Sequence, residues 1–460
     1  MNADAYDFAI IGAGVVGCAL ARCLTLEGAR VLVLEKALDV LDGASKGNSA
    51  ILHTGFDAPP GSLEQWCIAA GYKEYLEVAS ELGLPILRSG ALVLAWNEDQ
   101  LQKLPGLVEK SHSNGVTDVK MLPRVEILRR EPNLSKTVLG GFEVPGEYLV
   151  DPWTTAHAYI LQAIQNGAIL KRGAEVQAAR RSEGLWNLKT PIGAFQAASV
   201  INCAGLYGDL VDEVFLGRRN FTITPRKGQF LVFDKAASDL VDAIILPVPT
   251  STTKGVVVCR TIFGNVLVGP TAEDQDSRDD SSTSRQALEK LLQKGAEMLP
   301  GLVECEVTTS YAGLRPATEL PEYQIRRHSE LSYATVGGIR STGLSGALGI
   351  ARHVCELMIK QTANLAPIDG PAKPDLDRLS NYHQRDWELD DNGGIVCHCE
   401  LVTRREIARV LDGPMAPNTM AGLKRRTRVT MGRCQGFYCT GELAELTKGR
   451  LKIPLGEPNE

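Results

Sequence analysis

The sequence predicts an α/β protein with a discontinuous dinucleotide-binding domain, an interleaved β-rich domain and a small helical C-terminal domain. Three observations lead to this prediction. The N-terminal 36 residues alternate strand, helix and strand, β-rich stretches fill the middle of the chain, and four of the eleven cysteines gather near the C-terminus. A chain of 460 residues is long enough for roughly two or three domains with a large buried core.

The segment 6–36 has the pattern strand, glycine-rich turn, helix, strand. In a dinucleotide-binding unit the first glycine permits the tight turn, the second lets backbone amides approach a pyrophosphate, and the third lets the helix pack on the strand. These positions are Gly12, Gly14 and Gly17, and Glu35 at the end of the second strand is placed to hold a ribose hydroxyl. Because strand, helix and acid agree with the glycine pattern, we predict a bound dinucleotide.

Composition and charge restrict the partners of this chain. The formal net charge is −6 and the one basic cluster, 424–428, is short, so we expect no nucleic-acid partner. No apolar run approaches the roughly 20 residues that span a bilayer, and the first strand begins too early to leave room for a signal peptide. We therefore expect a cytoplasmic protein without a transmembrane segment. The seven singly scattered cysteines agree with reduced, buried thiols.

The stretch 42–55, which follows the second strand, is rich in small residues and in hydrogen-bond donors. Ser45, Asn48 and Ser49 offer hydroxyl and amide groups where a loop or helix start can follow a phosphate. His53 lies in the same stretch. A lone histidine is more often a packed or surface residue than a catalyst, so its role depends on the motif around it.

The dinucleotide unit, together with Gly-Asn-Ser-Ala-Ile-Leu-His-Thr-Gly at 47–55 and Pro-Gly-Ser-Leu at 60–63, resembles a known family. It is similar to the FAD-dependent glycerol-3-phosphate dehydrogenases and L-2-hydroxyglutarate dehydrogenases of the D-amino-acid-oxidase superfamily. The resemblance covers residues 6–362. It implies a Rossmann-like domain that binds FAD, with His53 beside the flavin.

Two later segments resemble the parts of this family that return to the cofactor. The strand at 198–205 ends at Gly205, which permits a close approach to FAD. The segment 333–350 reads as strand, glycine-rich turn and helix, and the start of this helix directs its amide dipole at the flavin. The residues expected at the helix start are Gly343, Leu344 and Ser345.

Several cations are candidates for binding an anionic substrate. Taken singly, each arginine is more often solvent-facing than functional. The family uses an arginine in the motif at 311–316 to hold the anionic group of its substrate, which implies this role for Arg315. Lys227 follows Arg226 at the start of another strand and is an open candidate for the substrate site. Arg340 stands where relatives more often carry an acid or amide, and we expect its charge to stabilise reduced flavin or bind substrate.

Four cysteines form two pairs near the C-terminus: Cys397 with Cys399 and, after 34 intervening residues, Cys434 with Cys439. A cytoplasmic location argues against disulfides, and the Cys-x-Cys spacing is too tight for a zinc knuckle. Four thiolates suit a [2Fe–2S] cluster, and zinc is the alternative. The spacing also resembles the bacterioferritin-associated-ferredoxin-like [2Fe–2S] domain that is appended to several FAD dehydrogenases.

These patterns divide the chain into four parts. We expect an FAD-binding domain at 1–82, 147–215 and 331–364, a substrate-binding domain at 83–146 and 216–330, a linker at 365–392, and the [2Fe–2S] domain at 393–460.

Together these expectations describe a dehydrogenase of a small anionic secondary alcohol resembling glycerol 3-phosphate. His53 is the base or its orienting partner, Arg315 the anion clamp and Arg340 the charge near the flavin. Electrons then pass through the cluster to an external acceptor, a quinone or an electron-transfer protein, which would place the protein in the cytoplasm or at the inner membrane face. The alternatives are a 2-hydroxy acid, amine or amino-acid dehydrogenase, and a non-catalytic FAD and iron–sulfur component of a hetero-oligomer.

Overall fold

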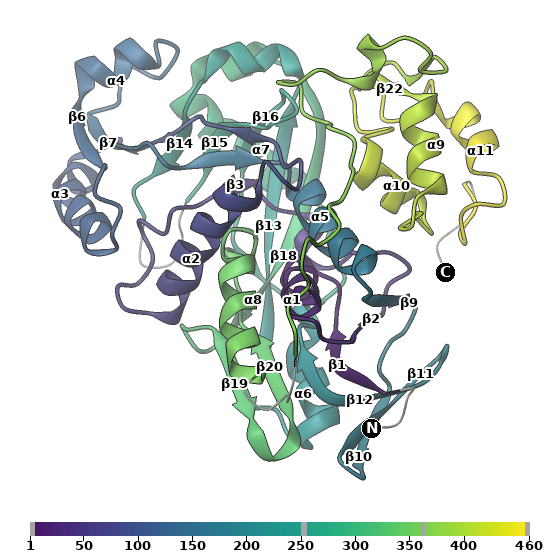
Figure 1. The fold of residues 1–460 in the computed structure, drawn as a ribbon. Coiled ribbons are helices and arrows are strands. Elements are labelled where there is room, and N and C mark those ends of the chain that lie inside the picture. The colour runs from purple at the N-terminus through teal and green to yellow at the C-terminus, as the bar shows by residue number, and fades with distance from the viewer. Residues whose placement is uncertain (1–4, 250–254, 360–364, 456–460) are drawn as a thin grey trace.

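The computed structural model describes residues 5–249, 255–359 and 365–455, which form two large sheets, a small connecting sheet and a C-terminal module (Figure 1). Strands from widely separated stretches of the chain meet in the eight-stranded sheet, and the stretches between them build the nine-stranded sheet. The chain therefore passes repeatedly from one sheet to the other, which confirms the interleaved α/β architecture. Within these residues, every helix is too short or too polar to cross a bilayer.

The eight-stranded sheet has a parallel core in the order β9-β2-β1-β12-β20, with β11 and β10 following β12 and β19 following β20 in antiparallel pairing. Alternate residues of β1 enter two cores: Phe8 and Ile10 pack with helices α1, α2, α5 and α8, whereas Ala9 and Ile11 pack on the side of α6. The strands are β1 (Tyr6–Ile11), β2 (Val31–Glu35), β9 (Ile169–Arg172), β10 (Ala178–Ser182), β11 (Leu185–Thr190), β12 (Gly193–Asn202), β19 (Gln324–His328) and β20 (Tyr333–Gly337). The helices are α1 (Val15–Leu26), α2 (Leu63–Val78), α5 (Pro152–Gln165), α6 (Gly208–Leu216) and α8 (Gly343–Ile359).

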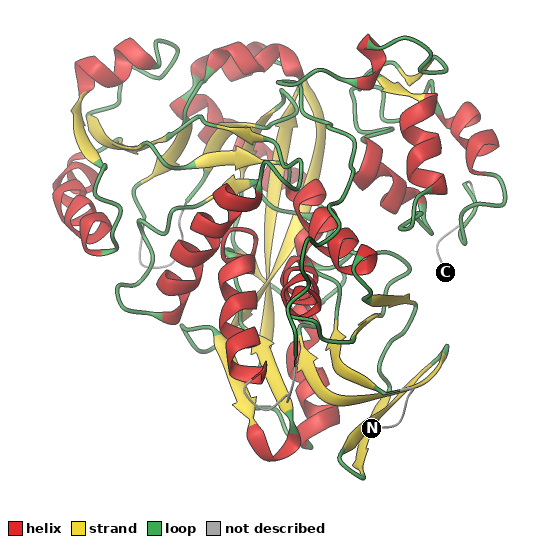
Figure 2. Cartoon of the chain, viewed as in Figure 1, coloured by secondary structure: helices red, strands yellow, loops and turns green. Residues whose placement is uncertain are grey.

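The nine-stranded sheet follows the order β17-β13-β16-β15-β14-β5-β7-β6, and β18 pairs with β13. It too separates two cores, because Leu92 and Leu94 of β5 face α7 while Val93 faces α3. The strands are β5 (Ala91–Ala95), β6 (Lys120–Pro123), β7 (Gly140–Val144), β13 (Ile223–Phe233), β14 (Ile244–Pro247), β15 (Val257–Arg260), β16 (Val266–Gly269), β17 (Glu273–Asp274) and β18 (Val307–Thr318), and the helices are α3 (Glu98–Ser113), α4 (Arg124–Arg130) and α7 (Arg285–Met298). Figure 2 shows the long strands β13 and β18 running from this sheet down toward the other.

A three-stranded sheet in the order β3 (Ile51–Leu52), β8 (Tyr148–Val150) and β4 (Ile86–Leu87) connects the two halves. β3 and β8 are antiparallel, with Ile51 opposite Leu149 and Leu52 opposite Tyr148. This register brings His53, the residue after β3, face to face with Glu147, the residue before β8.

The C-terminal module packs three short helices and a two-stranded sheet around its own apolar core. Its elements are β21 (Ile395–Cys397), β22 (Val402–Thr403), α9 (Arg404–Asp412), α10 (Met420–Thr427) and α11 (Thr440–Thr447). The module lies beside α5 and β16, and the segment that begins at residue 365 runs along α5 to reach it (Figure 1).

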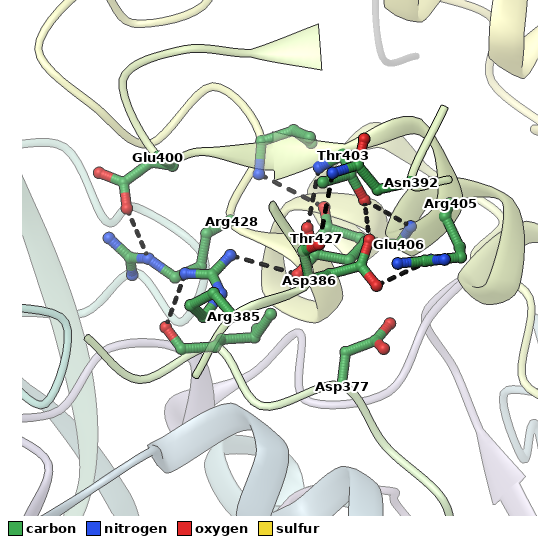
Figure 3. A network of polar contacts seen from close by, with 12 residues as sticks. Asp377, Arg385, Asp386, Asn392, Glu400, Thr403, Arg405, Glu406, Thr427 and Arg428 are labelled. Atoms are coloured by element: carbon green, nitrogen blue, oxygen red, sulfur yellow. Dashed lines mark hydrogen bonds and ion pairs between the residues drawn. The ribbon is translucent and has the colours of Figure 1, made fainter. Parts of the chain in front are cut away.

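The segment before this module, which we expected to be a linker at 365–392, is packed against its neighbours. Arg385 is only 4% exposed and donates to Glu406 at 3.2 Å, and Asp386 accepts from Arg405 at 2.8 Å, as Figure 3 shows. Leu379 is buried in an apolar cluster with Ile262 and Phe263. The proline-rich composition therefore predicted a linker where charge pairs hold the segment against α9 and the apolar contact of Leu379 holds it against Ile262 and Phe263.

The expected boundary at residue 330 also differs from the sheet pairing. β19 lies inside the range expected for the substrate-binding domain, yet it pairs with β20 and extends the eight-stranded sheet. β19 and β20 follow one another in the chain and pair as a hairpin, which is a short connection between neighbouring strands. The strand pattern of the sequence does not indicate which of the two sheets such a hairpin joins.

Candidate functional site

A cavity of about 920 Å³ lies where the two large sheets meet. Its walls include the end of β1, the loop after β2, the facing strands β13 and β18, and the start of α8. The residues expected from the sequence that line it are Gly12, Gly14, Glu35, Ser45, Asn48, Ser49, His53, Gly205, Arg315, Arg340, Gly343 and Leu344. The tertiary structure thus brings residues from four separate stretches of the chain to one site.

Three expected residues lie outside this lining. A Cβ at Gly17 would lie 2.0 Å from the carbonyl oxygen of Gly12, so Gly17 serves helix packing. Ser345 is buried behind the cavity, where its Oγ accepts from the backbone N–H of His53 at 2.8 Å. Lys227 pairs with Asp280 at 2.7 Å. Because side chains alternate along a strand and Arg226 lines the cavity, its neighbour Lys227 points elsewhere.

The turn after β1 presents backbone amides to the cavity. Gly12 has a φ of +101°, and a Cβ there would lie 2.6 Å from the carbonyl oxygen of Cys203, so only glycine fits. Ser45 Oγ accepts from the N–H of Val15, the first residue of α1, at 3.0 Å. Gly14, Ser45 and the start of α1 therefore form a cradle with the donors and positive helix end that suit a pyrophosphate.

Glu35 closes β2 beside this cradle. One carboxylate oxygen accepts from the N–H of Ala13 at 2.6 Å and the other from the N–H of Ala37 at 2.8 Å. Burial raises the pKa of Glu35 despite these two hydrogen bonds. The backbone thus holds the carboxylate at the cavity wall, where it can accept a ribose hydroxyl.

His53 forms a short contact on the cavity wall. Its Nδ1 lies 2.6 Å from Oε2 of Glu147, whose side chain is fully buried. The other carboxylate oxygen, Oε1, accepts from the backbone N–H and the hydroxyl of Thr54, at 2.6 and 2.8 Å. His53 itself remains 18% exposed, so Nε2 is the ring nitrogen available to a ligand.

Arg315 is a desolvated cation at the same cavity. Its Nη1 donates to the carbonyl oxygen of Thr271 at 3.4 Å, and among the described residues no carboxylate pairs with it. Burial, reinforced by the charge of Arg226 directly opposite on β13, lowers the pKa of Arg315 to about 10. A buried guanidinium without a carboxylate gains most from an incoming anion.

Arg340 is partnered within the protein. Its Nη2 donates to Glu64 Oε2 at 2.9 Å, and the hydroxyl of Thr342 donates to the other oxygen at 2.9 Å. Glu64 comes from the first turn of α2 and also lines the cavity. Arg340 therefore adds a compensated ion pair to the wall, whereas Arg315 adds an uncompensated positive charge.

Several residues at the cavity were missed by reasoning from the sequence. Arg278 lines it and binds Asp209 through both carboxylate oxygens, at 2.5 and 2.8 Å. Glu147 and Glu64 hold His53 and Arg340. Each of these acids is distant in sequence from its partner, so only strand pairing and helix packing reveal the contact.

The four C-terminal cysteines lie as two contacting pairs. The side chain of Cys399 lies beside that of Cys434, and the side chain of Cys397 beside that of Cys439. As they stand, no three metal-ligating side chains of the described residues converge on one point. Two adjacent thiol pairs nevertheless supply the four-sulfur donor set of a [2Fe–2S] cluster. Gly432 allows the close approach of Cys399 to this part of the chain, because a Cβ there would lie 2.2 Å from Cβ of Cys399.

The cysteine module contacts both halves of the cofactor site. Arg428 Nε donates to Glu400 at 2.9 Å, and its guanidinium lies 3.8 Å from the ring centroid of Phe263. Glu400 also pairs with Lys235 at 3.3 Å (Figure 3 shows Arg428 and Glu400). Phe263 stacks on Trp153, whose indole N–H donates to the carbonyl oxygen of Lys46 in the cavity wall at 3.2 Å.

A parallel sheet with a glycine-rich turn, a cavity shared with an antiparallel sheet, and an appended cysteine module define a two-centre flavoprotein oxidoreductase. Residues 7–357 match the FAD dependent oxidoreductase family (DAO), and the chain belongs to this family. Residues 395–448 match the BFD-like [2Fe-2S] binding domain. The protein is an FAD-dependent oxidoreductase with a [2Fe–2S] cluster, which confirms the family and the cofactors expected from the sequence.

The relatives support this assignment over most of the chain. The chain is 32% identical to a glycerol 3-phosphate dehydrogenase from Caloramator mitchellensis, across 98% of this chain and 96% of that one. It is 24% identical to one component of the anaerobic glycerol-3-phosphate dehydrogenase of Escherichia coli K12, across 97% and 88%. The FAD-bound L-α-glycerophosphate oxidase from Mycoplasma pneumoniae has a similar structure, with a TM-score of 0.76 and 27% identity over 82% of this chain and 100% of that chain.

Proposed function

We propose that this protein oxidises glycerol 3-phosphate at its secondary hydroxyl and delivers the electrons through the [2Fe–2S] cluster to an external acceptor. The observation that carries the proposal is Arg315, a partly buried guanidinium without a carboxylate partner among the described residues, on the cavity that also holds His53. The names of three relatives, all acting on glycerol 3-phosphate, support the choice of substrate.

The residues at the cavity divide the work of binding and proton transfer. Arg315 binds the phosphate, and Arg226 on the neighbouring strand adds positive charge that favours a dianion. His53 Nε2 accepts the proton of the secondary hydroxyl. When bound, FAD would supply a hydride acceptor for the carbon that bears this hydroxyl, and the cluster would supply one-electron transfer. The ion pair of Arg340 and Glu64 contributes a wall without net charge, which leaves the anion to Arg315.

An external electron acceptor is the partner that this arrangement requires. The loop between Cys434 and Cys439 exposes Phe437 and Tyr438 by 81% and 78%, whereas Cys397 and Cys439 are 1% exposed. This aromatic loop is therefore the exposed surface next to the buried cluster ligands. An acceptor protein would dock here to receive electrons from the cluster. The Escherichia coli relative is named as one component of a larger enzyme, which supports a hetero-oligomer.

The test is an anaerobic titration of the purified holoprotein, followed by the flavin absorbance. Glycerol 3-phosphate is expected to bleach the flavin, whereas glycerol, which lacks the phosphate, is not. L-2-hydroxyglutarate and amino acids share a carboxylate that Arg315 can also bind, so they are the critical comparison. If one of these compounds bleaches the flavin and glycerol 3-phosphate does not, that compound replaces glycerol 3-phosphate as the proposed substrate. If no compound bleaches it, a non-catalytic electron-transfer role is favoured over a dehydrogenase.

A further inference from the structure

We propose that Glu147 is the positioning residue of this site, because it fixes His53 in the tautomer whose Nε2 is free to accept a proton. The inference rests on the function proposed above, and it names a group that acts only through His53. Its basis is the 2.6 Å contact between Nδ1 of His53 and Oε2 of Glu147, a side chain with no exposed surface.

The hydrogen bonds of Glu147 decide which ring nitrogen carries the proton. Oε1 already accepts two hydrogen bonds from Thr54, one from its backbone N–H and one from its hydroxyl. Oε2 is therefore the oxygen that faces Nδ1. An ionised carboxylate only accepts hydrogen bonds, so Nδ1 must donate, and the neutral imidazole then has its lone pair on Nε2.

The surrounding backbone prevents this pair from drifting apart. The β3–β8 register sets the two residues opposite each other, and the N–H of His53 is held by Ser345 Oγ at 2.8 Å. On the other strand, the hydroxyl of Tyr72 donates to the carbonyl oxygen of Gly146 at 2.7 Å. Since Glu147 is fully buried, water does not compete for its oxygens.

This arrangement has a defined consequence for the proposed oxidation. As the carbonyl forms, the hydroxyl O–H bond breaks and its proton passes to Nε2 of His53, while FAD, when bound, would take the hydride from the C–H bond. The resulting imidazolium lies against the Glu147 carboxylate, which stabilises the new positive charge. Glu147 touches neither substrate nor cofactor in this step, since its side chain is enclosed by Thr54 and His53.

The decisive variant is Glu147→Gln, which keeps the size of the side chain. The N–H and the hydroxyl of Thr54 keep the amide oxygen of the new glutamine facing them, so its NH₂ group faces Nδ1 of His53. Because NH₂ donates, Nδ1 must accept, and the ring proton moves to Nε2. We expect the rate of flavin bleaching by glycerol 3-phosphate to fall about 100-fold or more, because general-base catalysis contributes roughly 10²–10⁴. The half-saturating substrate concentration is expected to stay within about threefold, since Arg315 is untouched. Glu131→Gln is the matched control, because it makes the same change at a buried glutamate that binds the backbone N–H groups of Asp242 and Ala243 and does not line the cavity.

Two further measurements separate positioning from a merely structural role. In a His53→Ala background, adding Glu147→Gln is expected to cause no further loss, because the two residues act as one unit. In the holoprotein labelled with ¹⁵N-histidine, the His53 signal, identified by its absence from His53→Ala, is expected to report Nδ1–H in the wild type and Nε2–H in Glu147→Gln. An unchanged tautomer, or additive losses in the double variant, would overturn the inference. The NMR result needs no substrate, so it stands even if glycerol 3-phosphate fails to bleach the flavin.

Discussion

Arg426 of the C-terminal module binds Asp39 of the cofactor domain through both terminal nitrogens, at 2.9 and 2.6 Å. Asp39 is 1% exposed, and Arg172 of β9 lies 3.6 Å from the same carboxylate. Breaking a buried pair leaves an uncompensated charge and is strongly destabilising. This contact therefore fixes the orientation of the cluster module on the loop that follows β2.

The glycine beside this pair gives the first prediction. A Cβ at Gly422 would lie 1.6 Å from Oδ2 of Asp39, so Gly422→Ala must displace the buried carboxylate. We expect the free energy of unfolding to fall by about 1–3 kcal/mol, measured by urea denaturation. Gly441→Ala is the control, because its Cβ would meet no atom within 4 Å and alanine favours the helix. Equal stability of the two variants would contradict this account of docking.

The second prediction concerns the anion clamp. Arg315→Met removes the partly buried guanidinium, and we expect the dissociation constant for glycerol 3-phosphate to rise roughly 10- to 100-fold, because a hydrogen bond to a charged group contributes about 1.5–3 kcal/mol. The measurement is the substrate dependence of flavin bleaching in a stopped-flow experiment. Arg219→Met, which removes an arginine from an exposed pair with Glu213, is expected to bind substrate normally. If the affinity of Arg315→Met for glycerol 3-phosphate is unchanged, Arg315 does not bind the phosphate and other residues must do so.

The third prediction assigns the cluster ligands. Cys434→Ser removes one thiolate of the four, and we expect loss of the broad iron–sulfur absorbance and of the reduced-cluster EPR signal. Flavin bleaching by substrate is expected to persist, because Cys434 does not line the FAD cavity. Cys305→Ser, at a cysteine outside the module, is the control that keeps the cluster. A cluster retained in Cys434→Ser would exclude that residue as a ligand.

The fourth prediction follows from the pKa of a buried acid. Burial raises the pKa of Asp209, but the hydrogen bonds from Arg278 and the N–H of Ile223 outweigh this effect and hold it below its ordinary value. A lowered folded-state pKa stabilises the protein above the unfolded value of about 3.9, and this contribution is lost as the pH falls through the folded pKa. We expect Asp209→Asn to lower the free energy of unfolding at pH 7 by about 3 kcal/mol.

The pH dependence of urea denaturation checks this prediction. The stability difference between wild type and Asp209→Asn is expected to shrink as the pH falls below about 4. Asp274→Asn is the matched control, since Asp274 pairs with Arg226 in the same way but is 52% exposed, and exposed pairs contribute at most about 1 kcal/mol. A constant difference across this pH range would show that the charge of Asp209 is not what stabilises the fold.

Local pattern explains most of what was predictable here. The continuous apolar runs of β1 and β2, the glycines between them and the proline at the start of α5 depend on neighbours in sequence, so their periodicity and backbone preferences are visible before folding. The Cys397–Cys399 and Cys434–Cys439 pairs are visible for the same reason. The sequence by itself thus determined the fold class, a dinucleotide site and a four-cysteine cluster site, whereas FAD and the places of His53 and Arg315 beside it were expected from the family resemblance.

The tertiary structure decided which side chains meet. Strand register places Glu147 opposite His53 and Arg226 opposite Arg315, and strand alternation turns Lys227 away from the cavity to Asp280. These contacts join residues that are tens of positions apart, and no local preference encodes which strand pairs with which. Burial then strengthens these contacts. A carboxylate or guanidinium that is removed from water interacts chiefly with the protein group packed against it, so that group determines its hydrogen bonding and its charge state.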